Sequence, residues 1–113
     1  MGQITTHVLD TAKGLPASGI KISLQRPIGE DQWEDITSGV TNSDGRVPIF
    51  MADDQTIEPG IYRMLFDTKT YFENIGTKGF YPEVPVIFEI TDGEHYHIPL
   101  LLSPFGYSTY RGS

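Results

Sequence analysis

The chain has 113 residues and a net charge of −7, and 38% of its residues are apolar. This length fits one domain with a single core, and the negative charge argues against a nucleic-acid surface, which needs clustered positive charge. The absence of cysteine excludes disulfides and thiol nucleophiles, and no apolar stretch approaches the roughly 20 residues that a membrane-spanning helix needs.

Short runs rich in Ile, Val, Thr, Phe and Tyr, separated by 12 Gly and 8 Pro residues, are typical of an antiparallel β-sandwich. We therefore expect an all-β fold with about seven or eight strands in two sheets. The first strand covers residues 5–10, with its even-numbered residues on one face and Thr5, His7 and Leu9 on the other. Further strands are expected over 19–26, 33–41, 61–66, 84–90 and from 95 onward.

Turn signals separate these strands. Pro27 and a loop at Gly29 are expected to close the second strand. Residues 42–45 (Asn-Ser-Asp-Gly) are expected to form a turn, and Arg46 directly after it is expected to begin a short strand that Pro48 limits. Asp92-Gly93 indicates a hairpin that joins the last two long strands.

One short helix is expected after the strand over 61–66. Asp67-Thr68 can cap its start, Tyr71, Phe72 and Ile75 share one face, and Gly76 supplies a left-handed stop. The apolar face of this helix is expected to lie against a sheet edge.

The run Ile98-Pro99-Leu100-Leu101-Leu102 breaks the alternation of polar and apolar residues, because both of its faces are apolar. A strand of a small sandwich with an apolar outer face needs a cover, and another subunit would supply it. The alternative is an edge strand buried under a loop of the same chain.

Three histidines, His7, His95 and His97, lie in strand-like runs. Imidazole is the side chain whose ordinary pKa lies near neutrality, so these residues are candidates for acid and base catalysis. By period-two spacing, His95 and His97 share one strand face. A histidine on a strand is more often structural than catalytic, so the assignment depends on what surrounds these residues.

The chain ends in an alternating aromatic and hydroxyl pattern from Gly106 to Ser113. We expect a strand that reaches the end and delivers the Ser113 carboxylate to a site. Taken singly, Arg46 would be a solvated charge, and Tyr110 would be strand surface.

Four segments together resemble the transthyretin-related 5-hydroxyisourate hydrolase family. They are residues 4–17, the turn 41–46, Phe80-Tyr81-Pro82, and the ending from His95 through Tyr110-Arg111-Gly112-Ser113. The resemblance spans essentially the whole chain and implies one domain over 1–113, a two-sheet antiparallel β-sandwich of the transthyretin (prealbumin-like) type with one short helix. It also implies a homotetramer, a dimer of dimers with active sites in a central channel. Transthyretin itself carries other residues at the positions of His7, Arg46 and His97.

For function, the resemblance implies hydrolysis of the cyclic amide of 5-hydroxyisourate in urate catabolism, with no cofactor and no bound metal. His7 is then the general base, kept neutral by Arg46, which also binds the substrate and stabilises the oxyanion. His97 and Ser113 would orient the substrate and deliver a proton to the leaving nitrogen, and Tyr110 would contact the ring. Two coupled imidazoles leave the choice of base and acid open.

Two other classes of function remain. His7, His95 and His97 form a histidine set of the kind that zinc uses, although no acidic residue completes a familiar spacing. The second class is a carrier that binds a small ligand or a metal without hydrolysing it. It stays open because a sandwich fold does not determine a function. The first residues do not resemble a secretory signal, so we expect a cytoplasmic protein whose partner is a small molecule, not a nucleic acid or a membrane.

Overall fold

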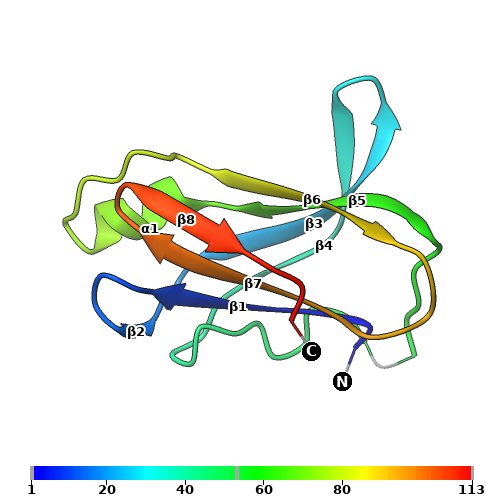
Figure 1. Ribbon diagram of the computed structural model, residues 1–113, viewed down its shortest axis with the longest axis horizontal. Helices are drawn as coiled ribbons and strands as arrows, with labels where there is room; N and C mark the ends of the chain where they lie inside the picture. The colour runs from blue at the N-terminus through cyan, green and yellow to red at the C-terminus, as the bar shows by residue number, and fades with distance from the viewer. Residues whose placement is uncertain (1, 53, 113) are drawn as a thin grey trace.

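Eight strands and one short helix occur in the residues that the computed structural model describes, 2–52 and 54–112. The strands are β1 (Ile4–Asp10), β2 (Leu15–Pro16), β3 (Lys21–Gly29), β4 (Gln32–Val40), β5 (Gly60–Phe66), β6 (Val84–Ile90), β7 (Tyr96–Ser103) and β8 (Gly106–Thr109), and helix α1 (Thr68–Asn74) follows β5. They form two four-stranded sheets, β2-β1-β7-β8 and β4-β3-β5-β6, which lie as two layers (Figure 1). The predicted two-sheet sandwich with one short helix is confirmed.

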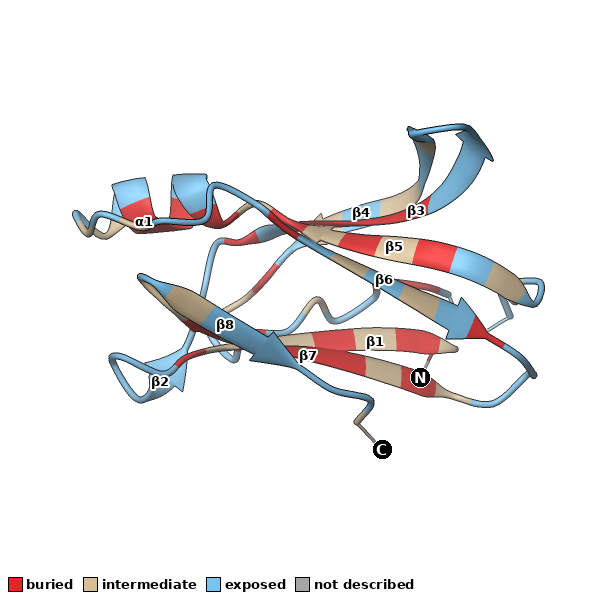
Figure 2. Cartoon of the chain, turned by 45° about the horizontal axis from the view of Figure 1, so that its top comes forward, coloured by how far each residue is buried: buried red, intermediate tan, exposed pale blue. Residues whose placement is uncertain are grey.

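The hydrophobic core fills the space between the two layers. Along β1, residues 4, 6, 8 and 10 are buried, whereas Thr5, His7 and Leu9 are only partly buried, as the alternation predicted. Figure 2 shows the two sheets as opposed layers, with buried residues alternating with less buried ones along β1 and β5. The outer face of β1, which carries Thr5, His7 and Leu9, therefore lies away from the core.

Strand β1 pairs with β7 in parallel, whereas the other strand pairs of the described residues are antiparallel. The sequence prediction had all pairs antiparallel. Parallel neighbours cannot be joined by a tight turn, and most of the chain separates these two strands. In the parallel register Thr5 lies opposite His97 and His7 lies opposite Pro99.

The predicted hairpin at Asp92-Gly93 is wrong, because β6 and β7 belong to different sheets. Asp92 instead stabilises a turn between the two layers. Its Oδ1 accepts hydrogen bonds from the Glu94 N–H at 3.1 Å and from the Tyr96 hydroxyl at 2.9 Å. The dipeptide correctly signals a turn, but a turn signal does not say which strands will pair.

The predicted end of the second strand at Pro27 is also wrong, because β3 continues to Gly29. Pro27 lies opposite Trp33, and the pairing register shifts between Pro27 and Gly29. An irregular register tolerates a residue that lacks a backbone N–H. The β3–β4 hairpin thereby extends beyond the body of the sandwich (Figure 1).

Two predicted strand segments are single bridges instead. Arg46 forms one isolated antiparallel bridge with His7, and no strand runs from it to Pro48. Strand β8 ends at Thr109, and within the described residues the segment after it returns to the sheet at Gly112, which bridges His97. The two bridges lie at opposite edges of the β1–β7 pair, with Arg46 beside β1 on the β2 side and Gly112 beside β7 on the β8 side.

The helix is capped as predicted. The Asp67 side chain accepts a hydrogen bond from the Thr70 N–H, and Gly76 has φ 69°. The buried Tyr71 donates its hydroxyl to Asp10 Oδ2 at 2.7 Å, and burial raises the pKa of Tyr71, helped by that hydrogen bond. This contact ties the helix to the end of β1. None of the helices in the described residues is long and apolar enough to cross a bilayer.

Candidate active site

His7 and His97 come together on the outer face of the β1–β7 pair. They are adjacent because β1 and β7 are parallel neighbours, with His7 opposite Pro99 and His97 two residues before Pro99 on the same strand. Side chains two residues apart on a strand point to the same face. The two imidazoles are therefore diagonal neighbours on a surface that both strands share.

The turn after β4 delivers Arg46 to this surface. Gly45 accepts a hydrogen bond from the Val8 N–H at 2.9 Å, and Asn42 Oδ1 accepts from the Asp44 and Arg46 N–H groups at 2.9 Å and 3.1 Å. Gly45 has φ 75°, and a Cβ there would overlap the Val8 carbonyl and lie 3.3 Å from His7 Cδ2. Only glycine allows the turn to approach β1 this closely.

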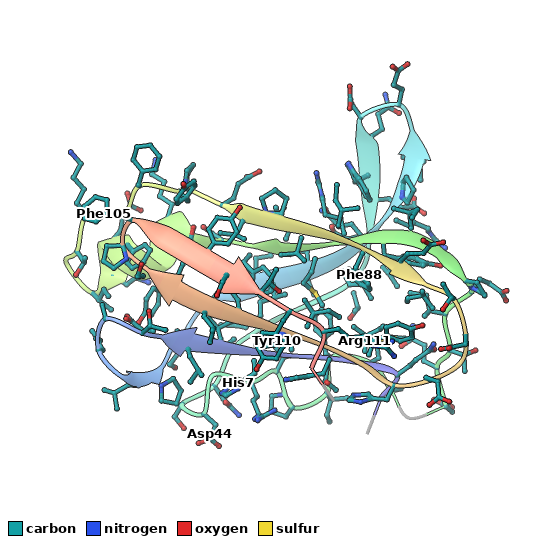
Figure 3. The ribbon with its side chains drawn as sticks, in the orientation of Figure 1. His7, Asp44, Phe88, Phe105, Tyr110 and Arg111 are labelled. Atoms are coloured by element: carbon teal, nitrogen blue, oxygen red, sulfur yellow. The ribbon has the colours of Figure 1, made fainter. Side chains whose placement is uncertain are left out.

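The pKa of His7 is lowered from its ordinary value, first by burial and second by the positive charge of Arg46. A backbone hydrogen bond at Asp44 and the charge of its carboxylate oppose this shift. Figure 3 shows His7 and Asp44 on the same side of β1. The sequence predicts Arg46 as the cause of this lowered pKa, and the structure adds burial as the larger cause. His7 is thus a neutral proton acceptor near neutral pH.

His97 is held between β1 and the C-terminal segment. Its Nδ1 lies 2.8 Å from the Thr5 hydroxyl, and its carbonyl accepts a hydrogen bond from the Gly112 N–H at 2.8 Å. A Cβ on Gly112 would lie 2.6 Å from His97 Cδ2, so the segment packs against the imidazole through a bare backbone. Burial lowers the pKa of His97, and the charges of Arg46, His7 and His95 lower it further, against a backbone hydrogen bond at Thr5.

Tyr110 lies apart from this cluster, 58% exposed. It lines a cleft of about 410 Å³ at the open edge between the sheets, together with Phe88, Ile98 and Arg111. The Arg111 guanidinium carbon lies 4.3 Å from the centre of the Tyr96 ring. Figure 3 shows Tyr110 and Arg111 on the segment that follows β8. Ser113, the other predicted site residue, lies outside the described residues.

The structure adds Thr5, His95 and Gly112 to the residues of the cluster. Thr5 could have been found from its position two residues before His7 on the same strand face. The Thr5 contact with His95 depends on the β1–β7 register, which the sequence alone does not show. Within residues 2–52 and 54–112, no group of three or more His, Asp or Glu side chains is arranged to hold a metal ion.

This arrangement supplies the parts that amide hydrolysis requires. A neutral imidazole can accept a proton from water, a second imidazole can donate one, and a neighbouring guanidinium can stabilise negative charge on an oxygen. Arg46 serves two purposes here, because its charge also lowers the pKa of both imidazoles.

Comparison with known proteins gives consistent matches over nearly the whole chain. The chain is 48% identical to the 5-hydroxyisourate hydrolase of Mus musculus over 112 residues, covering 97% of this chain and 94% of the relative. The solved 5-hydroxyisourate hydrolase of Klebsiella pneumoniae superposes with a TM-score of 0.85 at 35% identity, covering 97% of this chain and 98% of that one.

A sea bream transthyretin solved in complex with thyroxine superposes equally well, with a TM-score of 0.88 at 32% identity, covering 97% of this chain and 94% of that one. The shared sandwich is therefore of the transthyretin type. Residues 4–112 match the HIUase/Transthyretin family. The chain is a member of the HIUase/Transthyretin family.

Proposed function

We propose that this protein hydrolyses 5-hydroxyisourate to 2-oxo-4-hydroxy-4-carboxy-5-ureidoimidazoline, a step of urate catabolism. The observation that carries the proposal is the convergence of His7, His97 and Arg46 on one sheet face. It occurs in a chain 48% identical to a 5-hydroxyisourate hydrolase. A superposed fold alone would not distinguish this function from that of a carrier.

In the proposed mechanism His7 removes a proton from water, which attacks the ring carbonyl. The lowered pKa of His7 keeps it able to accept that proton at neutral pH. Arg46 binds the carbonyl-rich ring and stabilises the oxyanion that forms. His97 then gives a proton to the departing nitrogen, so the C–N bond breaks and a neutral amine group leaves.

Ser113 and Tyr110 are proposed to contact the substrate. Support for Ser113 comes from its neighbour Gly112, whose N–H binds the His97 carbonyl at 2.8 Å. Tyr110 is two residues before Gly112 on the same segment. The test compares the wild-type protein with Ser113→Ala, with Tyr110→Phe, and with a version extended beyond Ser113. Full activity in the extended version would contradict a role for the terminal carboxylate.

The main experiment is a hydrolysis assay with freshly generated 5-hydroxyisourate, measured against the spontaneous rate. The expected result is a protein-dependent loss of substrate absorbance that His7→Asn and Arg46→Gln each reduce strongly. A wild-type rate equal to the spontaneous one would disprove the proposal.

A carrier function is the alternative, and the match to a thyroxine complex of transthyretin favours it. Under that function the protein would bind thyroxine, or a metal ion, without turnover. Equilibrium dialysis with thyroxine, and metal analysis before and after chelation with the activity followed, separate the alternatives. Activity that survives chelation supports the metal-free mechanism.

We also propose a homotetramer, a dimer of dimers, located in the cytoplasm. Strands β6 and β8 are edge strands, each with one neighbour among the described residues, and both border the open cleft. Unpaired edges of this kind can pair with a second copy. Ile87 on β6 is 61% exposed, and on the outer face of β7 Leu101 is only partly buried, whereas Pro99 is already buried within the chain.

Light scattering during size-exclusion chromatography tests the assembly. We expect a tetramer for the wild-type protein and a smaller species for Ile87→Lys. The control is Ile28→Lys on the β3–β4 hairpin, which is similarly exposed, at 57%. A monomeric wild-type protein at micromolar concentration would contradict the proposal.

A further inference from the structure

The Thr5 hydroxyl lies between two imidazoles. Its oxygen is 2.8 Å from Nδ1 of His97 and 2.9 Å from Nε2 of His95. The two imidazole rings stack with their centroids 6.5 Å apart and an interplanar angle of 21°. The parallel register, which sets Thr5 opposite His97, places the hydroxyl there. Both distances are those of hydrogen bonds.

A hydroxyl has one proton to donate and two lone pairs with which to accept, so Thr5 can donate to at most one of the two imidazoles, and whenever it donates to one the other must donate to it. If Thr5 donates to His97 Nδ1, it accepts from the His95 Nε2–H, and the proton of neutral His97 is then on Nε2. If the direction is reversed, both neutral imidazoles carry their proton on Nδ1. Thr5 therefore couples the tautomer of His97 to that of His95.

The first direction is favoured for two reasons. It puts the proton of both neutral rings on Nε2, which is the tautomer that histidine prefers in water. It also persists when His95 is protonated, because an imidazolium can only donate at Nε2. The reverse direction exists only while His95 is neutral.

We propose that Thr5 and His95 are positioning residues that fix the catalytic tautomer of His97 and restore its proton during turnover. This inference rests on the proposed function, in which His97 Nε2 donates to the leaving nitrogen. Because Nδ1 faces Thr5, Nε2 is the nitrogen left for the substrate. Burial and the charge of Arg46 lower the pKa of His97, which favours the neutral ring. In a neutral ring the tautomer decides whether Nε2 carries the proton that the leaving nitrogen receives.

The proton transfers balance as a relay. The Nε2–H bond of His97 breaks as the N–H bond of the leaving nitrogen forms, while Thr5 gives its hydroxyl proton to His97 Nδ1. Thr5 in turn takes the Nε2 proton of His95, while solvent gives a proton to His95 Nδ1. His97 stays uncharged throughout and is never required to become an imidazolate. A solvent proton then adds to His97 Nε2, the Nδ1 proton of His97 passes back through Thr5 to His95 Nε2, and His95 Nδ1 releases its proton to solvent, so both tautomers return to the starting state.

The first experiment reads the tautomer without any substrate. In ¹⁵N-labelled protein at about pH 8, where ordinary histidines are neutral, long-range ¹H–¹⁵N spectra distinguish protonated from unprotonated ring nitrogens. We expect His97 protonated on Nε2 in the wild-type protein and a mixture of tautomers in Thr5→Val, with Thr5→Ser restoring the single form. A wild-type His97 protonated on Nδ1, or an unchanged spectrum in Thr5→Val, would overturn the proposal.

The second experiment measures turnover in the same variants. Valine has the shape of threonine and suits a strand, so Thr5→Val should keep its melting temperature. We expect kcat to fall roughly 10- to 100-fold, part of what general acid catalysis contributes, with KM within about twofold and with recovery in Thr5→Ser. Unchanged kcat in Thr5→Val would refute the relay.

His95→Gln separates the two roles of His95, because glutamine keeps an N–H donor but cannot supply a proton. We expect it to retain the His97 tautomer and still lose kcat, whereas His95→Phe loses both. A matched control is Thr11→Val, which removes a hydroxyl that donates only to the Leu102 carbonyl at 3.2 Å. If the wild-type protein lacks hydrolase activity, the proposed function fails, whereas the tautomer spectra still test the coupling through Thr5.

Discussion

The two faces of the β1–β7 pair differ in chemistry although their residues alternate one by one along the same strands. The inner face carries Ile4, Val8 and Leu100, all fully buried in the core. The outer face carries His7 and His97, which are only partly buried and have lowered pKa values. Because one backbone serves both faces, stability and activity should be separable by substitutions one residue apart.

Threonines show the same contrast. The hydroxyl of Thr6 is buried and donates to the Ile98 carbonyl at 2.8 Å, which satisfies it within the sheet. The hydroxyl of Thr5, one residue earlier, contacts two titratable side chains instead. The direction in which a side chain points, and not its residue type, determines its role here.

The largest effect is expected from His7→Asn on the outer face. Loss of the general base should lower kcat by about 10²- to 10⁴-fold, with little change in melting temperature, because the side chain is not part of the core. Progress curves with fresh substrate and thermal melts check both expectations.

The same measurements decide which imidazole is the base. If the assignment of His7 is wrong, His97→Ala should abolish water activation while His7→Ala mainly raises KM. Separate kcat and KM values for the two alanine variants distinguish these outcomes.

The inner-face counterpart is Leu100→Ala. Leu100 is completely buried, so its truncation should cost about 2–5 kcal/mol of unfolding free energy through lost burial and a residual cavity. Denaturant unfolding measures this loss, and kcat per folded molecule should remain near the wild-type value. The control, Leu15→Ala, removes a side chain that is 59% exposed and should change stability little. A large loss of kcat at full folding would mean that the two faces are not separable.

These two faces also mark what the sequence could predict. The alternation along β1 and the capping of α1 depend on local spacing, and both predictions are confirmed. The parallel β1–β7 register and the turn at Asp92-Gly93 between the sheets depend on long-range pairing, which local signals do not encode.

The candidate site was predicted through resemblance to a family, since no periodicity links His7 to Arg46 or His97. The bridges at Arg46 and Gly112 then bring the predicted segments to the imidazoles. Thr5 was missed as a partner of His95 because that contact exists only once the register is known. The position of Tyr110 in the edge cleft depends on where β8 ends. The sequence predicts a strand that continues to Ser113, whereas β8 ends at Thr109.

A smaller effect is expected from Gly112→Ala, which tests the close packing of the C-terminal segment on the outer face. The added Cβ would lie 2.6 Å from His97 Cδ2, so either the segment or the imidazole must shift. A displacement near 1 Å should lower kcat by roughly 10- to 100-fold, with an unchanged melting temperature. Gly93→Ala is the matched control, because nothing lies within 4 Å of its added Cβ. Equal kcat values in the two variants would show that the segment need not touch His97.

The smallest expected effect is a pH dependence of the unfolding free energy. The outer-face histidines should contribute to it, whereas the inner-face core residues should not. His7 and His97 have folded-state pKa values below the ordinary 6.5, so between those values the unfolded chain binds more protons than the folded one. Stability therefore falls as the pH decreases through 6.5 and levels off below the folded pKa values. Thermal melts between about pH 7.5 and pH 5.5 should show this decline in the wild-type protein. Leu100→Ala should show the same decline, with a lower melting temperature at each pH. The double variant His7→Asn/His97→Asn should lose most of it, since asparagine does not titrate. A decline of the same size in the double variant would assign it to other groups, and a rise in stability toward pH 5.5 would contradict the lowered pKa values of both imidazoles.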